Sequence, residues 1–174
     1  MGGNITVTSE FGKGSRFEFN VFLTKGIGKE FSAEDLRPEP TDDICFAGKR
    51  ILLVEDIEIN RIIVQSLLEN THVGVDCAEN GLEAAEMFLQ NQDKYDLIFM
   101  DVQIPVMGGF DATRKIRAVG SAQTKSVPII AMTANAFKED VDKCRTAGMD
   151  DRIAKPIETD ILLAKMCKYL RGIP

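Results

Sequence analysis

The sequence contains no tryptophan, one histidine and four cysteines among its 174 residues. A lone histidine, His72, cannot build a histidine metal site, and the cysteines lack the CxxC spacing that indicates zinc or redox chemistry. We therefore interpret the cysteines as free thiols of a reducing compartment. They are Cys45, Cys77, Cys144 and Cys167.

Long apolar runs are also missing. No stretch approaches the roughly 18 apolar residues that a membrane-spanning helix requires. The start, MGGNITVTSE, lacks the basic and apolar regions of a signal peptide. We expect a cytoplasmic protein without direct membrane contact, with any membrane anchor of a longer parent protein lying upstream.

Positive charge is in the minority. The chain contains 21 Lys and Arg residues and 27 Asp and Glu residues, which gives a net charge of −6. Because nucleic-acid binding requires a basic surface, we expect no nucleic-acid partner. Hydrophobic residues make up 44% of the chain, which is enough for an ordinary buried core.

Four short apolar runs each end in polar residues. Such continuous runs are typical of strands buried on both faces of a parallel sheet. The runs are ILLV at 51–54, LIFM at 97–100, VPIIAM at 127–132 and DRIA at 151–154. Ligands bind beyond the carboxyl ends of such strands, so the polar residues that follow should converge on one site. These residues are Glu55, Asp56, Asp101, Thr133 and Lys155.

Strand and helix patterns alternate five times, which predicts an α/β fold. Crossover handedness then favours a flavodoxin-like (βα)5 arrangement, with a five-stranded parallel sheet of order 2-1-3-4-5. We expect strands near 50–54, 73–78, 96–100, 127–132 and 151–154. We expect helices near 58–70, 81–91, 109–119, 135–147 and 158–171. The apolar face of the first helix is predicted to comprise Ile59, Ile62, Ile63, Ser66 and Leu67.

The residue types at the strand ends indicate a chemistry. Carboxylates gather around a hard cation such as Mg²⁺ or Mn²⁺, and an ammonium and a hydroxyl suit the oxygens of a phosphoryl group. A single charged residue at a loop start would be unremarkable in an α/β fold. Five of them at four strand ends favour a functional site.

The motifs ILLVEDIEIN, LIFMDVQIPVMGG, PIIAMTANA and DRIAKPI resemble the receiver domain of two-component response regulators. The resemblance covers residues 49–171. It implies that Asp101 accepts a phosphoryl group and that Glu55, Asp56 and Asp101 hold Mg²⁺ together with the backbone carbonyl of Gln103. The receiver would catalyse only its own phosphorylation and dephosphorylation.

The same resemblance assigns the remaining site residues. Thr133 and Lys155 would bind the phosphoryl oxygens, with Lys155 pairing with Asp101 before phosphorylation as the alternative. The bond between Lys155 and Pro156 is expected to be cis. Phosphorylation would reset the surface around the fourth and fifth helices.

The chain departs from the family at two informative positions. Glu55 stands where aspartate is commoner, and Arg152 stands where many receivers carry Tyr or Phe. Because an arginine resists burial unless it is paired, we expect Arg152 to stay outward, pairing with an acid such as Asp151 or Glu139 or with a partner protein. Thr133 would then carry most of the switch.

The N-terminal residues 1–23 alternate apolar and polar side chains on both sides of the turn sequence GKGS, which predicts a β-hairpin. The text MGGNITVTSEFGKGSRFEF resembles the last hairpin of the ATP-binding domain of sensor histidine kinases. We therefore interpret the chain as the C-terminal part of a hybrid sensor histidine kinase, whose ATP site would lie upstream. Residues 24–47 would form a linker, and 48–174 the receiver domain.

This interpretation implies partners. The phosphoryl donor would be a phosphohistidine of the kinase dimerisation domain or of a histidine phosphotransfer protein. A hairpin separated from its domain should be either disordered or paired with another chain, including a homodimer.

Several alternatives remain open on the sequence alone. The domain could be a docking or dimerisation module that works without phosphorylation. A Mg²⁺-dependent phosphatase of the haloacid dehalogenase type would need a second aspartate where Gln103 stands. A flavodoxin-like electron carrier would have its phosphate repelled by Glu55 and Asp56. A stand-alone receiver with an accidental hairpin competes with the hybrid kinase interpretation.

Overall fold

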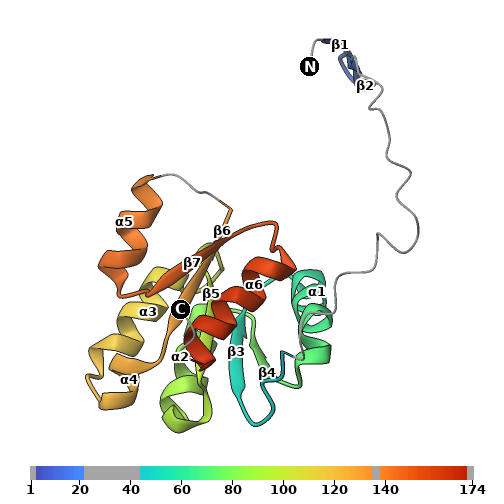
Figure 1. Ribbon diagram of the computed structural model, residues 1–174. Helices are drawn as coiled ribbons and strands as arrows, with labels where there is room; N and C mark the ends of the chain where they lie inside the picture. The colour runs from blue at the N-terminus through green and yellow to red at the C-terminus, as the bar shows by residue number, and fades with distance from the viewer. Residues whose placement is uncertain (1–2, 22–43, 135–137, 172–174) are drawn as a thin grey trace, which may run out of the picture. The chain divides into compact units, whose positions relative to one another are not determined.

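The computed structural model describes residues 3–21, 44–134 and 138–171 (Figure 1). The chain divides into two compact units, Met1–Thr41 and Asp42–Pro174. Among the described helices, none combines the length and the apolar character needed to cross a membrane.

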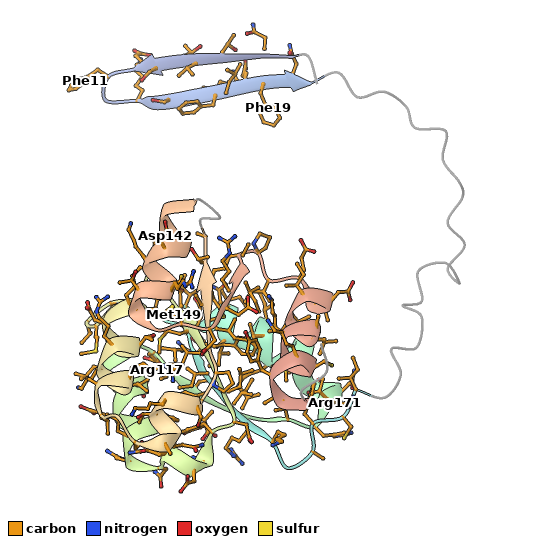
Figure 2. All side chains as sticks on the ribbon, turned by 60° about the vertical axis from the view of Figure 1, so that its left-hand side comes forward. Phe11, Phe19, Arg117, Asp142, Met149 and Arg171 are labelled. Carbon is orange, nitrogen blue, oxygen red and sulfur yellow. The ribbon has the colours of Figure 1, made fainter. Side chains whose placement is uncertain are left out.

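The first unit contains the predicted β-hairpin. Strands β1 (Gly3–Glu10) and β2 (Gly14–Val21) pair antiparallel, with Ile5 opposite Phe19 and Val7 opposite Phe17. These four side chains share one face of the hairpin, because alternate residues of a strand point to the same side. All four are more than half exposed, and Phe19, which is labelled in Figure 2, is 76% exposed. The hairpin thus presents an apolar face that is exposed among the described residues of its unit.

The second unit is built on a five-stranded parallel sheet. Its strands are β3 (Arg50–Val54), β4 (Gly74–Ala78), β5 (Leu97–Asp101), β6 (Ile129–Thr133) and β7 (Asp151–Ala154). Their spatial order is β4-β3-β5-β6-β7, which is the predicted order 2-1-3-4-5. The flavodoxin-like fold is therefore confirmed.

The helices cover both faces of this sheet (Figure 1). They are α1 (Glu58–Leu68), α2 (Gly81–Gln90), α3 (Gly109–Ala118), α4 (Ala122–Ser126), α5 (Lys138–Ala147) and α6 (Thr159–Met166). Short 3₁₀ turns follow α1 (Glu69–Thr71) and α2 (Gln92–Lys94), and a π turn (Cys167–Arg171) extends α6. The short helix α4 was not predicted. The first turn of the predicted helix 135–147 lies outside the described residues.

Two apolar clusters, one on each face of the sheet, form the core. One cluster joins Leu52 and Ile98 to Phe88 of α2 and Ile116 of α3. The other packs the opposite face of the sheet against α1 and α6 through Val64, Leu68, Leu162 and Met166. Each fully buried side chain of this size stabilises the fold by about 1.5–3 kcal/mol.

The predicted apolar face of α1 is wrong except for Leu67, which is partly buried and packs against the core. Val64 and Leu68 face the core, whereas Ile59, Ile62 and Ile63 are exposed. The helix carries apolar residues on two sides, so their periodicity alone did not identify the buried side. The exposed isoleucines form an apolar stripe on the outside of α1.

Arg117 of α3 forms hydrogen bonds with segments whose proximity the sequence patterns did not predict. Its guanidinium donates to the carbonyl oxygen of Gly148 (3.0 Å), the carbonyl oxygen of Thr124 (2.6 Å) and the Asp150 carboxylate (2.9 Å). The same Asp150 oxygen accepts the backbone N–H of Ile129. One side chain of α3 therefore holds α4 and the loop before β7 in place (Figure 2).

The chain enters the second unit through a docked segment. Phe46 is buried, and its backbone N–H donates to the carbonyl oxygen of Thr71 at 2.7 Å. Arg171 covers the Phe46 ring at 5.0 Å and donates to the carbonyl oxygen of Cys45 at 2.8 Å. Ile44 also packs against this core. Arg171 thereby joins the C-terminal end of the described unit to the segment Cys45–Phe46 near its beginning.

Asp151 at the start of β7 anchors α6. Its carboxylate accepts hydrogen bonds from Lys165 (2.7 Å), Lys168 (3.1 Å), the Tyr169 hydroxyl (3.1 Å) and the backbone N–H of Arg152 (2.8 Å). Burial alone would raise the pKa of this carboxyl. The hydrogen bonds outweigh burial and lower the pKa to about 2.

This network leads to a pH-dependent prediction. A carboxyl whose pKa is lowered by folding stabilises the native state above its unfolded pKa of about 3.9, and that stabilisation is lost as the pH falls. Asp151→Asn should therefore reduce the free energy of unfolding at pH 7 by about 1–2 kcal/mol. The difference from the unchanged protein should shrink between pH 4 and pH 2. Urea unfolding at several pH values measures it, with the exposed Asp93→Asn as control. A difference that stays constant down to pH 2 would contradict the assignment.

Candidate functional site

The site lies at the carboxyl edge of the parallel sheet. Glu55 directly follows β3, Asp101 ends β5, Thr133 ends β6 and Lys155 directly follows β7. Glu55 is 1% exposed, and both Asp101 and Thr133 are 5% exposed. Carboxylate oxygens of Glu55, Asp56 and Asp101 lie within 4.8 Å of one another. The convergence expected from the strand ends is therefore present.

One ammonium group connects two of these carboxylates. Lys155 Nζ lies 2.6 Å from Asp101 Oδ2 and 2.5 Å from Glu55 Oε2. The expected pairing of Lys155 with Asp101 is observed, and the contact with Glu55 adds to it. Burial alone would lower the pKa of Lys155, but the two carboxylates raise it. The side chain therefore remains an ammonium at neutral pH.

Asp101 is held from two directions. Its Oδ2 faces Lys155, and its Oδ1 accepts the backbone N–H of Gln103 at 3.0 Å. Burial raises the pKa of this carboxyl, and the hydrogen bonds from Lys155 and Gln103 oppose that effect. The carboxylate is thus a desolvated acceptor whose orientation is fixed by donors on both of its oxygens.

The turn after Asp101 depends on a close backbone approach. A Cβ atom on Gly109 would overlap the carbonyl oxygen of Asp101, and it would lie 3.0 Å from Met100 Cγ. Gly109 N also donates to the carbonyl oxygen of Val102 at 3.1 Å. Glycine therefore allows α3 to start directly against the end of β5. The left-handed residue of this loop is Val106, with φ 67°.

Two residues of α1 contact the acidic loop, and sequence reasoning missed both. Asn60 Nδ2 donates to Glu55 Oε1 at 2.7 Å. Arg61 donates to the backbone carbonyl oxygens of Glu55 (2.8 Å) and Asp56 (3.0 Å). The signal available in the sequence was the polar pair NR in the first turn, directly before the apolar run IIV of the same helix.

The loop after β7 completes the site. The peptide bond between Lys155 and Pro156 is cis, as expected. The backbone N–H of Lys155 donates to the carbonyl oxygen of Thr133 at 2.8 Å, which fixes the two neighbouring strand ends together. A groove of about 310 Å³ next to Lys155 is lined by Glu55, Asn60, Ile63, Val64, Lys155, Pro156 and Ile157. One residue of the apolar stripe of α1, Ile63, therefore lies beside the site.

The expectation that Arg152 stays outward holds only in part, because the residue is half-buried and one of its guanidinium nitrogens is buried. Arg152 Nη1 is buried and has no hydrogen-bond partner within the described part of the chain. The expected ion pair with Asp151 is also absent there, because Lys165 and Lys168 occupy that carboxylate. The side chain of Glu139 lies outside the described residues. Arg152 lines a groove of about 340 Å³ together with Cys144, Arg145, Met149, Asp150 and Asp151.

The donor set fits a hard divalent cation. Glu55, Asp56 and Asp101 offer oxygen ligands only, and such sets suit Mg²⁺ or Mn²⁺ rather than zinc or copper. Asp56 is exposed, which leaves room for water ligands. The assignment of the Gln103 carbonyl to the metal stays a prediction.

Sequence comparisons identify relatives of this chain. Residues 51–166 match the response regulator receiver domain. The aerobic respiration control sensor protein ArcB of Escherichia coli (strain K12) is 39% identical over 169 residues, which are 97% of this chain and 21% of ArcB. The two-component response regulator ORR41 of Oryza sativa subsp. japonica is 42% identical over 122 residues, covering 69% of this chain and 93% of that protein.

Solved structures with the same fold agree with these matches. The receiver domain of the sensor histidine kinase PA1611 from Pseudomonas aeruginosa PAO1, solved with a magnesium ion in its active site cleft, is 37% identical, with a TM-score of 0.65. The match covers 72% of this chain and 99% of that one. The receiver domain of Saccharomyces cerevisiae Ssk1, solved with the histidine phosphotransfer protein Ypd1, is 30% identical, with a TM-score of 0.64 over 70% of this chain and 88% of that one.

The sheet order, the carboxylates at its edge and the matched residues agree with one another. This chain belongs to the response regulator receiver family.

Proposed function

We propose that this chain accepts a phosphoryl group on Asp101 from a phosphohistidine and thereby acts in a phosphorelay. The observation that carries the proposal is the contact of Lys155 with a buried Asp101 inside a cluster of three carboxylates. A divalent cation, Mg²⁺ or Mn²⁺, would be held by Glu55, Asp56, Asp101 and the backbone carbonyl of Gln103. When bound, it would offset the repulsion between these oxygens and the phosphoryl group.

The chain's own residues would carry the transfer. An oxygen of Asp101 attacks the phosphorus, a P–O bond forms, and the electron pair of the breaking P–N bond returns to the imidazole nitrogen. Lys155 shifts from the carboxylates to a phosphoryl oxygen, and the Thr133 hydroxyl binds another. Catalysis then consists of positioning and charge stabilisation, so no dedicated base is needed.

The surroundings of the site support a protein donor. The apolar stripe of Ile59, Ile62 and Ile63 lies exposed on α1, and Ile63 lines the groove beside Lys155. An apolar surface next to a buried nucleophile suits the docking of a histidine-bearing helix. The donor would be a histidine phosphotransfer protein or the dimerisation domain of the kinase. The Ssk1 receiver was crystallised with a partner of the former kind.

The wider protein would be a hybrid sensor histidine kinase. The match to the sensor protein ArcB extends over 97% of this chain, well beyond residues 51–166. This supports assigning 1–23 to the end of the kinase ATP-binding domain, 24–47 to a linker and 48–174 to the receiver. The protein would act in the cytoplasm.

Replacing the proposed nucleophile tests the function directly. Asp101→Asn should abolish phosphorylation by acetyl phosphate or a phosphohistidine protein in the presence of Mg²⁺, because the amide does not act as nucleophile. Intact-mass spectrometry measures the added phosphoryl group, and peptide mapping locates it. The exposed Asp111→Asn is a matched control that should be phosphorylated normally. Stoichiometric phosphorylation of the Asp101→Asn chain at another residue would refute the assignment.

Thr133 and Arg152 would form the switch. Movement of the Thr133 hydroxyl toward a phosphoryl oxygen would pull on the start of the segment that leads to α5. The surroundings of the Arg152 side chain would then change, because Arg152 lines one groove together with Cys144 and Met149. Of these residues, Cys144 belongs to α5.

This switch is testable by NMR. Addition of beryllofluoride should shift the Arg152 side-chain Nε signal in the unchanged protein. In Thr133→Ala the shift should be reduced several-fold, although Asp101 still binds the analogue. The Arg114 Nε signal serves as an internal reference on α3. An Arg152 signal that does not move in the unchanged protein would refute the role of this residue.

The N-terminal hairpin would pair two copies of the chain when the rest of the kinase domain is missing. Its face of Ile5, Val7, Phe17 and Phe19 is exposed within residues 3–21, the part of this unit that the structure describes. Phe19→Lys should therefore weaken self-association at least tenfold, because it places a charge in the centre of that face. Sedimentation equilibrium measures the effect. Thr8→Lys, on the opposite face, is the control. A wild-type chain that stays monomeric at all concentrations would contradict the pairing.

A further inference from the structure

We propose that Asn60 and Arg61, neighbours in the first turns of α1, are positioning residues that hold Glu55 and Asp56 in the geometry that a divalent cation requires. The inference rests on the proposed metal site. It concerns two side chains that would not touch the metal. Asn60 fixes a carboxylate, and Arg61 fixes the backbone that carries both acids.

Asn60 restrains the longer of the two acids. Glu55 has one more methylene than aspartate, and an unrestrained carboxylate on that longer side chain would sample several rotamers. Here Oε1 accepts from Asn60 Nδ2 at 2.7 Å, and Oε2 lies 2.5 Å from Lys155 Nζ. Because Glu55 is 1% exposed, the two donors leave it a single orientation. If Lys155 moves to a phosphoryl oxygen, Asn60 still holds the carboxylate while Oε2 becomes free for the cation.

Arg61 restrains the backbone. Its Nη1 bridges the carbonyl oxygens of Glu55 and Asp56 at 2.8 and 3.0 Å, and its Nη2 pairs with Glu79 at 2.9 Å. The side chain is only 13% exposed. A guanidinium is planar and can donate to three acceptors at once, whereas a lysine ammonium at the end of a flexible stem does not reproduce that fork. Arg61 thereby fixes the loop after β3 to the loop after β4.

These contacts should influence metal affinity strongly. Some groups hydrogen-bond to a metal ligand without touching the metal. Removing such a group typically lowers the metal affinity by about 10–100-fold. The weak, partly hydrated binding expected for Mg²⁺ places the effect here near the lower end, at about tenfold. The same change should leave the protein folded, because the core on this side of the sheet rests on Val64 and Leu68 rather than on Asn60 or Arg61.

The test is a titration of the full chain with each metal. MgCl₂ binding is monitored by amide chemical shifts, and MnCl₂ binding by water proton relaxation. Asn60→Ala and Arg61→Lys should each weaken Mn²⁺ binding by about tenfold. Thermal unfolding of the metal-free proteins verifies that each variant is folded. Gln65→Ala on the same helix and Arg114→Lys on α3 are the matched controls and should bind like the unchanged protein.

A double-mutant cycle separates positioning from a general effect on α1. In Glu55→Asp the carboxylate retreats by roughly 1.5 Å from Asn60, the length of one C–C bond. Asn60→Ala should then lower the Mn²⁺ affinity only slightly in the Glu55→Asp background. The effects of the two substitutions on Mn²⁺ affinity should therefore be non-additive. An equal loss in both backgrounds, or no loss in either, would overturn the role of Asn60. Arg61→Lys binding as tightly as the unchanged protein would overturn the role of Arg61.

Asp56→Ala keeps this test separate from the proposed function. If Asp56→Ala titrates like the unchanged protein, the cation is not bound by the acidic cluster and the proposed site itself fails. If Asp56→Ala loses binding while the Asn60 and Arg61 variants keep it, the metal site stands and only the positioning inference fails.

Discussion

The second unit depends on an electrostatic constraint at one edge of its sheet. Carboxylate oxygens of Glu55, Asp56 and Asp101 lie within 4.8 Å of one another, and two of these residues are almost fully buried. At an effective dielectric constant of about 20, two unit charges at this separation repel by about 3.5 kcal/mol, and closer ones repel more strongly. The arrangement therefore needs a compensating cation. The ammonium of Lys155 supplies that charge in the chain itself, at 2.5 and 2.6 Å from two of the acids.

Topology explains why such residues meet. The central strands β3 and β5 are buried on both faces, so they accept only apolar side chains along their length. Polar residues are therefore confined to the strand ends, and a parallel sheet brings all of its carboxyl ends to the same edge. The sites of Glu55, Asp101, Thr133 and Lys155 follow from this rule. Gly109 then allows α3 to begin against Asp101 without displacing it.

The same rule explains what the sequence predicted well and what it did not. Strands and site acids were predictable because each run of buried residues is short, apolar and bounded by polar residues. The buried side of α1 was not, because Ile59, Ile62 and Ile63 compete with Val64 and Leu68 for the core-facing positions. The short helix α4 was missed although its contacts are local: the Ser121 hydroxyl accepts the backbone N–H of Thr124, and Arg117, seven residues before Thr124, donates to the Thr124 carbonyl oxygen. The contacts of Arg117 with Gly148 and Asp150, by contrast, join residues far apart in the chain and leave no local pattern.

Arg152 shows the limit of arguing from residue type alone. The desolvation cost of a guanidinium led to the expectation of an outward side chain, yet its Nη1 is buried beside α5. The acid nearest in sequence, Asp151, is engaged by Lys165 and Lys168, so pairing with Arg152 would have to displace one of them. Competition among neighbours, rather than the preference of one residue, decides which charges pair. Glu55 illustrates the same point, because its extra methylene is tolerated where Asn60 and Lys155 each take one of its oxygens.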